Sequence, residues 1–318
     1  MSQTPAAAAR PEDTRRGLQL ALAAYGVWGL LALFWKQLGH VPAYEQLIHR
    51  VVWAAVVMVV LLLVRGQLGA LRTVLADPPR RRRLLLSAAL LAVNWFVFVY
   101  AVASNRVLHV SLGYYINPIV SMALGTLVLG ERLRPLQWAA VASAVVGVLL
   151  LLFWSGELPW IGVSVALAFG FYGLVRKTVA VEALPGSAIE ALILALPCGA
   201  AMLWLELGSG AGHFVRAGLP TTGLLLTAGL VTAVPILWFT AAARRLPLYA
   251  MGFLQYITPT THFILAVWRF GEHFTLGHGL AFAAIWAGVL LFAGDMLAQQ
   301  RRQRRLYAEE ERRSGSSE

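Results

Sequence analysis

The stretch Tyr115-Ile116-Asn117-Pro118, followed after eleven residues by Gly130-Glu131, decides how this chain is interpreted, because it occurs twice. The second copy starts with Tyr256-Ile257-Thr258-Pro259 and ends with Gly271-Glu272, at an offset of 256 − 115 = 141 residues. The same offset relates Gly147-Val148-Leu149-Leu150 to Gly288-Val289-Leu290-Leu291. An ungapped offset over so long a stretch indicates an internal duplication.

The composition predicts an integral membrane protein. Hydrophobic residues make up 59% of the 318 residues and charged residues only 13%, whereas soluble domains carry about 25% charged residues. The mean hydropathy is +0.69, and so apolar a chain requires a bilayer as its solvent. The single cysteine, Cys198, excludes an intrachain disulfide and a thiolate metal cluster.

Apolar segments alternate with short connections along the whole chain, and many of these connections contain Gly or Pro. A helix needs about 20 residues to cross a hydrocarbon core about 30 Å thick, and the alternating pattern of barrel strands is absent from the sequence. We therefore expect an all-α integral membrane protein with ten transmembrane helices. The expected spans are about 17–36, 44–64, 84–103, 111–129, 136–154, 160–177, 188–207, 221–243, 249–268 and 277–297.

Lysine and arginine are unequally distributed between the two sides of such a bundle. With the N-terminus in the cytoplasm, the only basic residues on the outer side are Lys36, Arg50, Arg106, Arg216 and Arg269, out of 26. This positive-inside pattern places both termini in the cytoplasm. We interpret the basic excess as a signal of membrane orientation and expect no nucleic-acid partner. The basic tail would be an orientation anchor, with contact to anionic lipid as the alternative.

The duplication and the span count together predict inverted repeats. Because five spans precede residue 155 and five follow it, the second copy enters the membrane from the opposite side. The expected organisation is a cytoplasmic segment 1–16, repeats 17–154 and 160–297, and a tail 298–318. Inverted repeats are typical of secondary transporters, whose substrate site lies near the midplane at the repeat interface.

The duplicated prolines, Pro118 and Pro259, fall near the centres of spans four and nine. A proline inside a helix removes one hydrogen bond, and in lipid the freed carbonyl must meet protein or a water-lined cavity. We predict a pair of kinked helices that line a central cavity; a purely structural kink is the alternative. The polar residues expected on the cavity side are Tyr114, Asn117, Gln255 and Thr258.

The second span has an apolar run, Val51–Val64, that is too short to cross the membrane alone. Extending it outward places Arg50 below the outer interface and Trp53 one turn deeper. A charge at membrane depth marks a transport pathway by default, and Arg50 is suited to meet a carboxylate. The alternative is that Arg50 extends toward the outer interface and pairs with Glu45 or Glu272.

Two histidines and two glutamates are further candidates. His49 and His262 are candidate proton-relay groups, with satisfied core histidines as the alternative. We expect no metal, because Glu45 and His49 alone form too weak a ligand pair. Glu131 and Glu272 follow helix-ending glycines, and each is expected either to cap a helix or to form a gating contact.

Other polar or small residues in the spans fit either packing or a pathway. Asn94 in span three needs a buried partner, and Trp238 follows Pro235 in span eight. Arg176 and Lys177 at the end of span six are expected as interface anchors. A stripe of small residues in spans five and ten permits close packing with the same chain or with a second copy in a homodimer. The stripe consists of Ala139, Ser143, Gly147, Ala284 and Gly288.

Several catalytic motifs are absent from the sequence. It contains no GxxxxGK[ST], HExxH or GxSxG, and its aspartates lie away from the expected midplane. We expect a protein that is not an enzyme, has no cofactor and does not hydrolyse ATP itself. A membrane-embedded enzyme acting on lipid or on an amphipathic small molecule is the alternative.

Four blocks of sequence resemble a known family. They are His49–Val51, Ser111–Pro118, Phe171–Lys177 and Gly252–Ile257. Together with the duplicated Pro-x11-Gly-Glu pattern, they make residues 15–297 similar to RarD permeases of the EamA-like branch of the drug/metabolite transporter superfamily. The resemblance implies a multi-pass permease of the bacterial inner membrane. Relatives in the superfamily move amino acids, metabolites or drugs, and the resemblance implies no particular substrate.

These observations predict a secondary transporter of small metabolites or drugs that works by alternating access around a midplane cavity. Its partners would be a small-molecule substrate and the lipid bilayer. The residues expected to bind substrate are Trp28, Arg50, Trp53, Asn94, Tyr100, Tyr114, Asn117, Tyr172, Trp238, Gln255, Tyr256 and Thr258.

Overall fold

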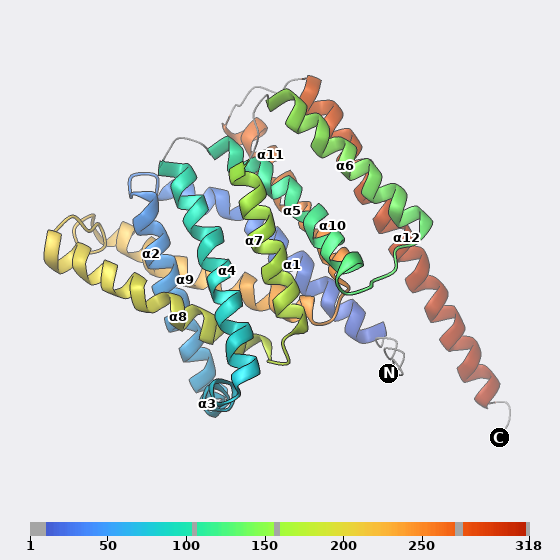
Figure 1. Ribbon diagram of the computed structural model, residues 1–318, viewed down its shortest axis with the longest axis horizontal. Helices are drawn as coiled ribbons and strands as arrows, with labels where there is room; N and C mark the ends of the chain where they lie inside the picture. The colour runs from blue at the N-terminus through green and yellow to red at the C-terminus, as the bar shows by residue number, and fades with distance from the viewer. Residues whose placement is uncertain (1–10, 104–106, 156–159, 271–275, 316–318) are drawn as a thin grey trace.

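The computed structural model describes residues 11–103, 107–155, 160–270 and 276–315, and every regular element within these ranges is a helix (Figure 1). The elements are α1 (Pro11–Gln37), α2 (Ala43–Val64), α3 (Leu68–Ala76), α4 (Pro78–Ala103), α5 (Val107–Leu127), α6 (Pro135–Ser155), α7 (Trp160–Thr178), α8 (Ala183–Leu203) with a π-helical extension η1 (Trp204–Ser209), α9 (Leu219–Ala243), α10 (Leu248–Gln255), α11 (Ile257–Phe270) and α12 (Leu276–Gly315).

Six segments are long and apolar enough to cross a membrane by length and composition. They are Glu12–Gln37, Ala43–Val64, Pro135–Trp154, Ala183–Ser209, Leu219–Ala243 and Gly279–Gln299. Many of their large apolar side chains are exposed, as expected where lipid replaces water around the protein. The chain is therefore an all-helical integral membrane protein with multiple spans.

The connection between α2 and α4 contains a helix that the sequence analysis missed. Residues Leu68–Ala76 of this connection form α3. Asp77 then starts α4 by accepting the backbone N–H of Arg80 at 3.2 Å, and it pairs with the Arg80 side chain at 3.1 Å. The side of the molecule on which α3 lies is called the α3 side below.

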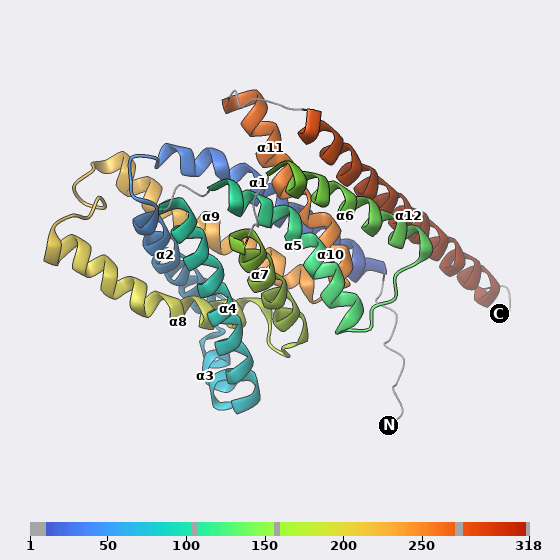
Figure 2. The same cartoon turned by 45° about the horizontal axis from the view of Figure 1, so that its top comes forward.

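Helix pairs determine where side chains from distant parts of the chain meet. In both views α6 lies along α12 (Figures 1 and 2). Helix α5 packs against α7 and α10, and α4 packs against α7 and α8. Helix α1 packs against α9 and α11, and α2 packs against α8 and α9. Each of these contacts joins a helix before residue 155 to one after it.

Only one of the two duplicated prolines lies next to a break between helices. Helix α5 continues past Pro118, whereas the other copy is divided at Tyr256, between α10 and α11. The two copies touch each other directly. The Tyr115 hydroxyl donates to the Pro259 carbonyl at 2.9 Å, and Gly252 packs against the Pro118 carbonyl.

The small-residue stripe is used within the chain. Ser143 donates to the Ala284 carbonyl at 2.7 Å. A Cβ added at Gly147 would lie 2.6 Å from the Ala281 carbonyl oxygen, and one added at Gly288 would lie 2.6 Å from the Ala140 carbonyl oxygen. The glycines therefore allow α6 and α12 to approach closely. The contacts of Ser143, Gly147, Ala284 and Gly288 are therefore made within one chain.

Candidate functional site

A cavity of about 430 Å³ lies between helices from both parts of the chain. Its wall combines apolar and aromatic side chains with a few polar groups, which is the usual composition of a small-molecule site. The lining residues are Trp28, Leu31, Ala32, Trp35, Ala43, Gln46, Leu47, Arg50, Leu91, Asn94, Trp95, Phe98, Tyr114, Asn117, Phe169, Tyr172, Ile236, Gln255, Thr258, Pro259 and His262.

Many of the residues chosen from the sequence are brought together in this cavity. The lining includes predicted members from α1, α2, α4, α5, α7, α10 and α11. These are Trp28, Arg50, Asn94, Tyr114, Asn117, Tyr172, Gln255, Thr258, Pro259 and His262.

Four of the residues expected to bind substrate lie elsewhere. Trp53 stacks on Phe214, and Tyr100 is 41% exposed beside Trp160. Trp238 packs against an apolar cluster around α1 and α9, and Tyr256 is buried in the cluster that includes the α6–α12 contact. Each had been chosen as an aromatic residue in a span, and composition does not specify which way an aromatic side chain faces.

Three helices present their cavity residues with one spacing, and the sequence analysis did not use this signal. Helix α1 contributes residues 28, 31, 32 and 35, α2 contributes 43, 46, 47 and 50, and α4 contributes 91, 94, 95 and 98. Steps of three, four and seven residues keep side chains on one face of a helix. Extending that face from Trp28 predicts Trp35, from Arg50 predicts Gln46, and from Asn94 predicts Phe98.

Arg50 is held between two of these aromatic residues. Its guanidinium carbon lies 5.5 Å from the ring centre of Trp35 and 4.9 Å from that of Trp95. Its Nε is buried without a hydrogen-bond partner, and no described carboxylate forms an ion pair with it. The predicted pairing with Glu45 is wrong, because that carboxylate binds His213. Cation–π contacts therefore orient a guanidinium that has no counter-ion among the described residues.

Most polar side chains around Arg50 are fixed by backbone carbonyls. Asn94 donates to the Val165 carbonyl at 3.0 Å, and Thr258 donates to the Tyr25 carbonyl at 2.9 Å. His262 donates through Nε2 to the Trp28 carbonyl at 3.2 Å. Asn117 differs, because its Oδ1 is buried without a hydrogen-bond partner among the described residues.

Aromatic rings close the cavity toward the α3 side. Trp28 lies 5.9 Å from Phe169, which lies 5.7 Å from Tyr172, and Tyr172 stacks on Phe239 at 6.0 Å. Tyr25 completes the cluster, 5.7 Å from Trp28. These contacts leave a packed floor beneath the lining residues.

A buried ion pair lies below this floor, and it corrects the expectation that Arg176 is an interface anchor. Arg176 is fully buried, and its Nη1 lies 3.4 Å from Oε1 of Glu190, which is 1% exposed. Glu190 also accepts hydrogen bonds from Ser87 and, at 3.2 Å, from the cavity residue Tyr172. Glu190 is not among the residues predicted from the sequence, although it lies near the start of the expected span 188–207.

Glu131 joins the two parts of the chain on the α3 side. Its carboxylate accepts the backbone N–H groups of Leu248 at 2.8 Å and Tyr249 at 3.1 Å. Lys177 lies 3.6 Å from the same carboxylate and donates to the Leu246 carbonyl at 2.5 Å. Glu131 thus caps α10, far along the chain, rather than the helix that follows it. Glu272 lies outside the described residues.

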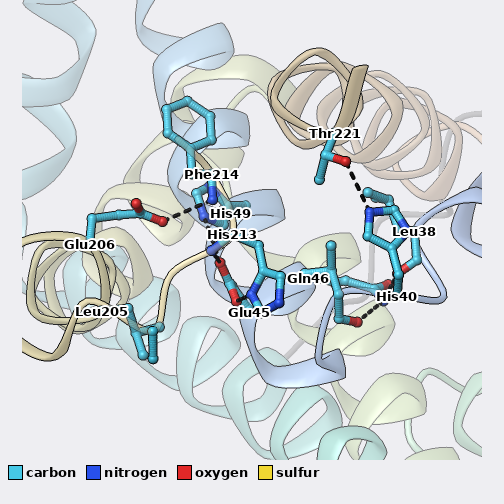
Figure 3. A network of polar contacts seen from close by, with 12 residues as sticks. Leu38, His40, Glu45, Gln46, His49, Leu205, Glu206, His213, Phe214 and Thr221 are labelled. Carbon is cyan, nitrogen blue, oxygen red and sulfur yellow. Dashed lines mark hydrogen bonds and ion pairs between the residues drawn. The ribbon is translucent and has the colours of Figure 1, made fainter. Parts of the chain in front are cut away.

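A second network lies on the side opposite α3 and includes His49 (Figure 3). Glu45 accepts the backbone N–H of His213 at 2.5 Å and its Nδ1–H at 2.8 Å, and Glu206 accepts the Phe214 N–H at 2.9 Å. His49 stacks on Phe214 and does not line the cavity. The network anchors the connection between η1 and α9 to the start of α2.

Glu45, His49 and Glu206 bring potential ligand atoms within 4.8 Å of one another, which is compatible with a metal site by distance alone. However, Trp53 donates its indole N–H to Nδ1 of His49 at 3.2 Å. A neutral imidazole has one lone pair, so its Nε2 then carries the proton. In this arrangement the lone pair of His49 Nδ1 is already engaged by Trp53.

Comparison with known proteins identifies the class. Residues 15–153 match the EamA-like transporter family. A crystal structure of another protein shares the fold with a TM-score of 0.67 at 18% identity, over 88% of this chain and 96% of that one. The first part of the chain is therefore similar to EamA-like membrane transporters.

Closer relatives narrow this class. The chain is 44% identical to protein RarD of Escherichia coli over 92% of its own length and 98% of that protein. It is 43% identical to an uncharacterized transporter of Pseudomonas aeruginosa, over 91% and 97%, and 39% identical to RarD of Streptomyces exfoliatus, over 92% of each. The chain belongs to the RarD proteins of the EamA-like transporter family. It is thus a multi-pass membrane protein of a transporter family and not an enzyme.

Proposed function

We propose that this protein is a secondary transporter of small metabolites or drugs, built from ten transmembrane helices in two inverted repeats. The helix contacts support this symmetry. If α1 corresponds to α7, α4 to α9, and α5 to α10–α11, then the α1–α9 contact is the counterpart of α7–α4, and α1–α11 is the counterpart of α7–α5. The reciprocal contacts of Gly147 and Gly288, which are 141 residues apart, support the same pseudo-twofold axis.

The observation that carries the proposal is a cavity lined by both repeats and extended toward one side only. Its lining runs from central residues, such as Tyr172 and Asn117, to Trp35 and Ala43 at the ends of α1 and α2 opposite α3. The positive-inside pattern makes that side the periplasmic one. The aromatic floor and the Glu131 contact lie on the cytoplasmic side. We interpret the arrangement as an outward-facing state of an alternating-access cycle.

The proposed roles differ among the predicted residues. Arg50, Asn117 and Gln255 are retained as substrate-binding residues because they line the cavity. His262 is retained as the candidate proton relay for the same reason, whereas His49 belongs to the outer network. Glu131 is assigned to closure of the cytoplasmic side.

Metabolite profiling of a deletion strain tests the proposal. The strain is complemented with wild type, with Ala32→Trp, which fills the cavity, or with Ala139→Trp, which alters an exposed position of α6. We expect wild type and Ala139→Trp to change the distribution of the same solutes across the membrane, and Ala32→Trp to lose that change at equal membrane abundance. No solute shift with wild type, even on overexpression, would reject a transporter.

A further inference from the structure

We propose that the cavity selects an organic monoanion with a flat apolar body, and that Arg50 binds its anionic group. This inference rests on the proposed transport function and specifies the substrate class of the same site. It follows from three features of the lining: its charge, the way Arg50 is held, and the distribution of aromatic and amide groups.

The charge of the lining is uncompensated. Among the described lining residues, Arg50 is the only one with a fixed charge, and none is acidic. The nearby buried carboxylates are already engaged, since Glu45 binds His213 and Glu190 binds Arg176. A single cation in a site of low dielectric favours one negative charge on the ligand. A cation or a zwitterion would bring an ammonium group for which the lining holds no carboxylate.

The surroundings of Arg50 also suit binding of a planar anionic group such as a carboxylate. The guanidinium lies over the rings of Trp35 and Trp95, and its Nε has no hydrogen-bond partner among the described residues. A guanidinium oriented in this way presents N–H donors in a fixed fork, which matches the two oxygens of a carboxylate. Ordering Arg50 before binding lowers the entropic cost of capturing the anion.

The rest of the wall indicates the body of the ligand. Trp28, Trp95, Phe98 and Phe169 provide apolar faces, and a volume of about 430 Å³ suits a small molecule. Aromatic walls favour stacking with a flat ring. The unpaired Oδ1 of Asn117 leaves one polar position for a hydrogen-bond donor on the ligand, apart from its anionic group.

Calorimetric titration of the purified full-length protein in nanodiscs of neutral lipid tests the assignment. The probes share one phenylpropyl skeleton: 3-phenylpropionate (anion), 3-phenylpropanamide (neutral), 3-phenylpropylamine (cation) and phenylalanine (zwitterion). We expect the anion to bind at least roughly tenfold more tightly than each of the others. Equal or tighter binding of the amide or the amine would overturn the proposal.

Titration with two inorganic anions tests whether negative charge alone is sufficient for binding or whether the organic body of the ligand is also needed. Chloride and phosphate are titrated alone and as competitors of 3-phenylpropionate. We expect them to bind weakly and to displace the organic anion only at high concentration. If either binds as tightly as 3-phenylpropionate, the site is an inorganic-anion site and the proposed apolar body is wrong.

Variants of Arg50 test whether this side chain causes the preference for an anion. Arg50→Gln should weaken 3-phenylpropionate binding by roughly 30-fold or more and abolish the preference over the amide. Arg50→Lys should recover part of the affinity, because it keeps the charge but not the fork. The matched control is Arg65→Gln at the exposed opposite end of α2, which should bind like wild type. Unchanged binding by folded Arg50→Gln would refute the role of Arg50; if that variant does not fold, the wild-type probe series decides.

The outcomes also separate this inference from the transport proposal. Binding of the anion without any flux in proteoliposomes would reject transport of that anion and keep the specificity of the site. Flux of neutral or cationic solutes without anion binding would support transport and reject the substrate class.

Discussion

Glu131 caps a helix that begins 117 residues further along the chain, because its carboxylate accepts the N–H of Leu248 at 2.8 Å. The N-terminus of α10 has no capping side chain of its own, since Pro247 precedes it. The first N–H groups of a helix lack intrahelical acceptors and carry partial positive charge, so a carboxylate stabilises them. In the proposed mechanism, this contact must break when the cytoplasmic side opens.

Replacing Glu131 by alanine should therefore favour the cytoplasm-open state. Loss of a capping side chain costs about 1–2 kcal/mol, enough to shift a balanced conformational equilibrium by roughly tenfold. The measurement is alkylation of Leu246→Cys by a membrane-impermeant thiol reagent added from the cytoplasmic side, in a Cys198→Ser background. Glu131→Gln, which retains one acceptor oxygen, should give an intermediate rate. Equal alkylation of wild type and Glu131→Ala would refute the closing role.

The Arg176–Glu190 pair should respond differently to single and double replacement. Arg176→Met leaves the buried Glu190 carboxylate without its cation and should destabilise the protein by about 3–5 kcal/mol. Arg176→Met combined with Glu190→Gln removes both charges and should recover part of that loss. Thermal unfolding in detergent at constant pH measures the difference. A double variant no more stable than Arg176→Met would show that the charge left behind is not the cause.

The helical, membrane-spanning nature of the chain could be predicted because apolar length and lysine and arginine counts depend on local sequence. Prolines were less informative: Pro118 and Pro259 occupy equivalent positions, yet only the copy containing Pro259 is divided. Whether a helix breaks at a proline depends on the groups packed around it, such as the Tyr115 hydroxyl that bonds the Pro259 carbonyl. Such contacts join residues far apart in sequence.

Only part of the cavity lining could be predicted from the sequence, because polar residues and tryptophans differ in what their position in a span indicates. Polar residues inside spans, such as Asn94 and Thr258, were recognised because lipid exposure would leave them unsatisfied. Tryptophans carry no such signal, since lipid, protein interior and a cavity all accommodate an indole ring. Trp35 and Trp53 therefore looked alike in the sequence, although only Trp35 lines the cavity. The repeated face of α2 does not exclude Trp53 either, because Trp53 follows Arg50 by three residues, so only the folded chain separates it from Trp35.

The network in which Glu45 binds His213 predicts that replacing Glu45 has a local effect. Its carboxylate holds both the backbone N–H and the ring of His213, so Glu45→Ala should release the connection 210–218 without unfolding the bundle. We expect amide exchange in that connection to become at least roughly tenfold faster, as for the loss of about 1.4 kcal/mol of local stability. Exchange in α6 and α12 is the internal control. Unchanged exchange at 210–218 would contradict the anchoring role.

The reciprocal glycines of α6 and α12 give the sharpest test of the proposed pseudo-twofold packing. A methyl group at Gly147 would lie 2.6 Å from the Ala281 carbonyl oxygen, and one at Gly288 would lie equally close to the Ala140 carbonyl oxygen. Gly147→Ala and Gly288→Ala should therefore destabilise the protein by similar amounts, about 1–3 kcal/mol each, because the two helices must move apart.

The control for these substitutions is Gly199→Ala in α8, where an added Cβ meets nothing within 4 Å. Because alanine favours a helix more than glycine does, this variant should be as stable as wild type or slightly more so. Thermal unfolding of all three variants in the same detergent checks the comparison. Since both glycines contribute to one interface, the double variant should lose less than the sum of the single losses: once α6 and α12 have separated for one methyl group, the second is accommodated at lower cost. Strictly additive losses would mean that the two contacts are independent and that the helices do not move as rigid units.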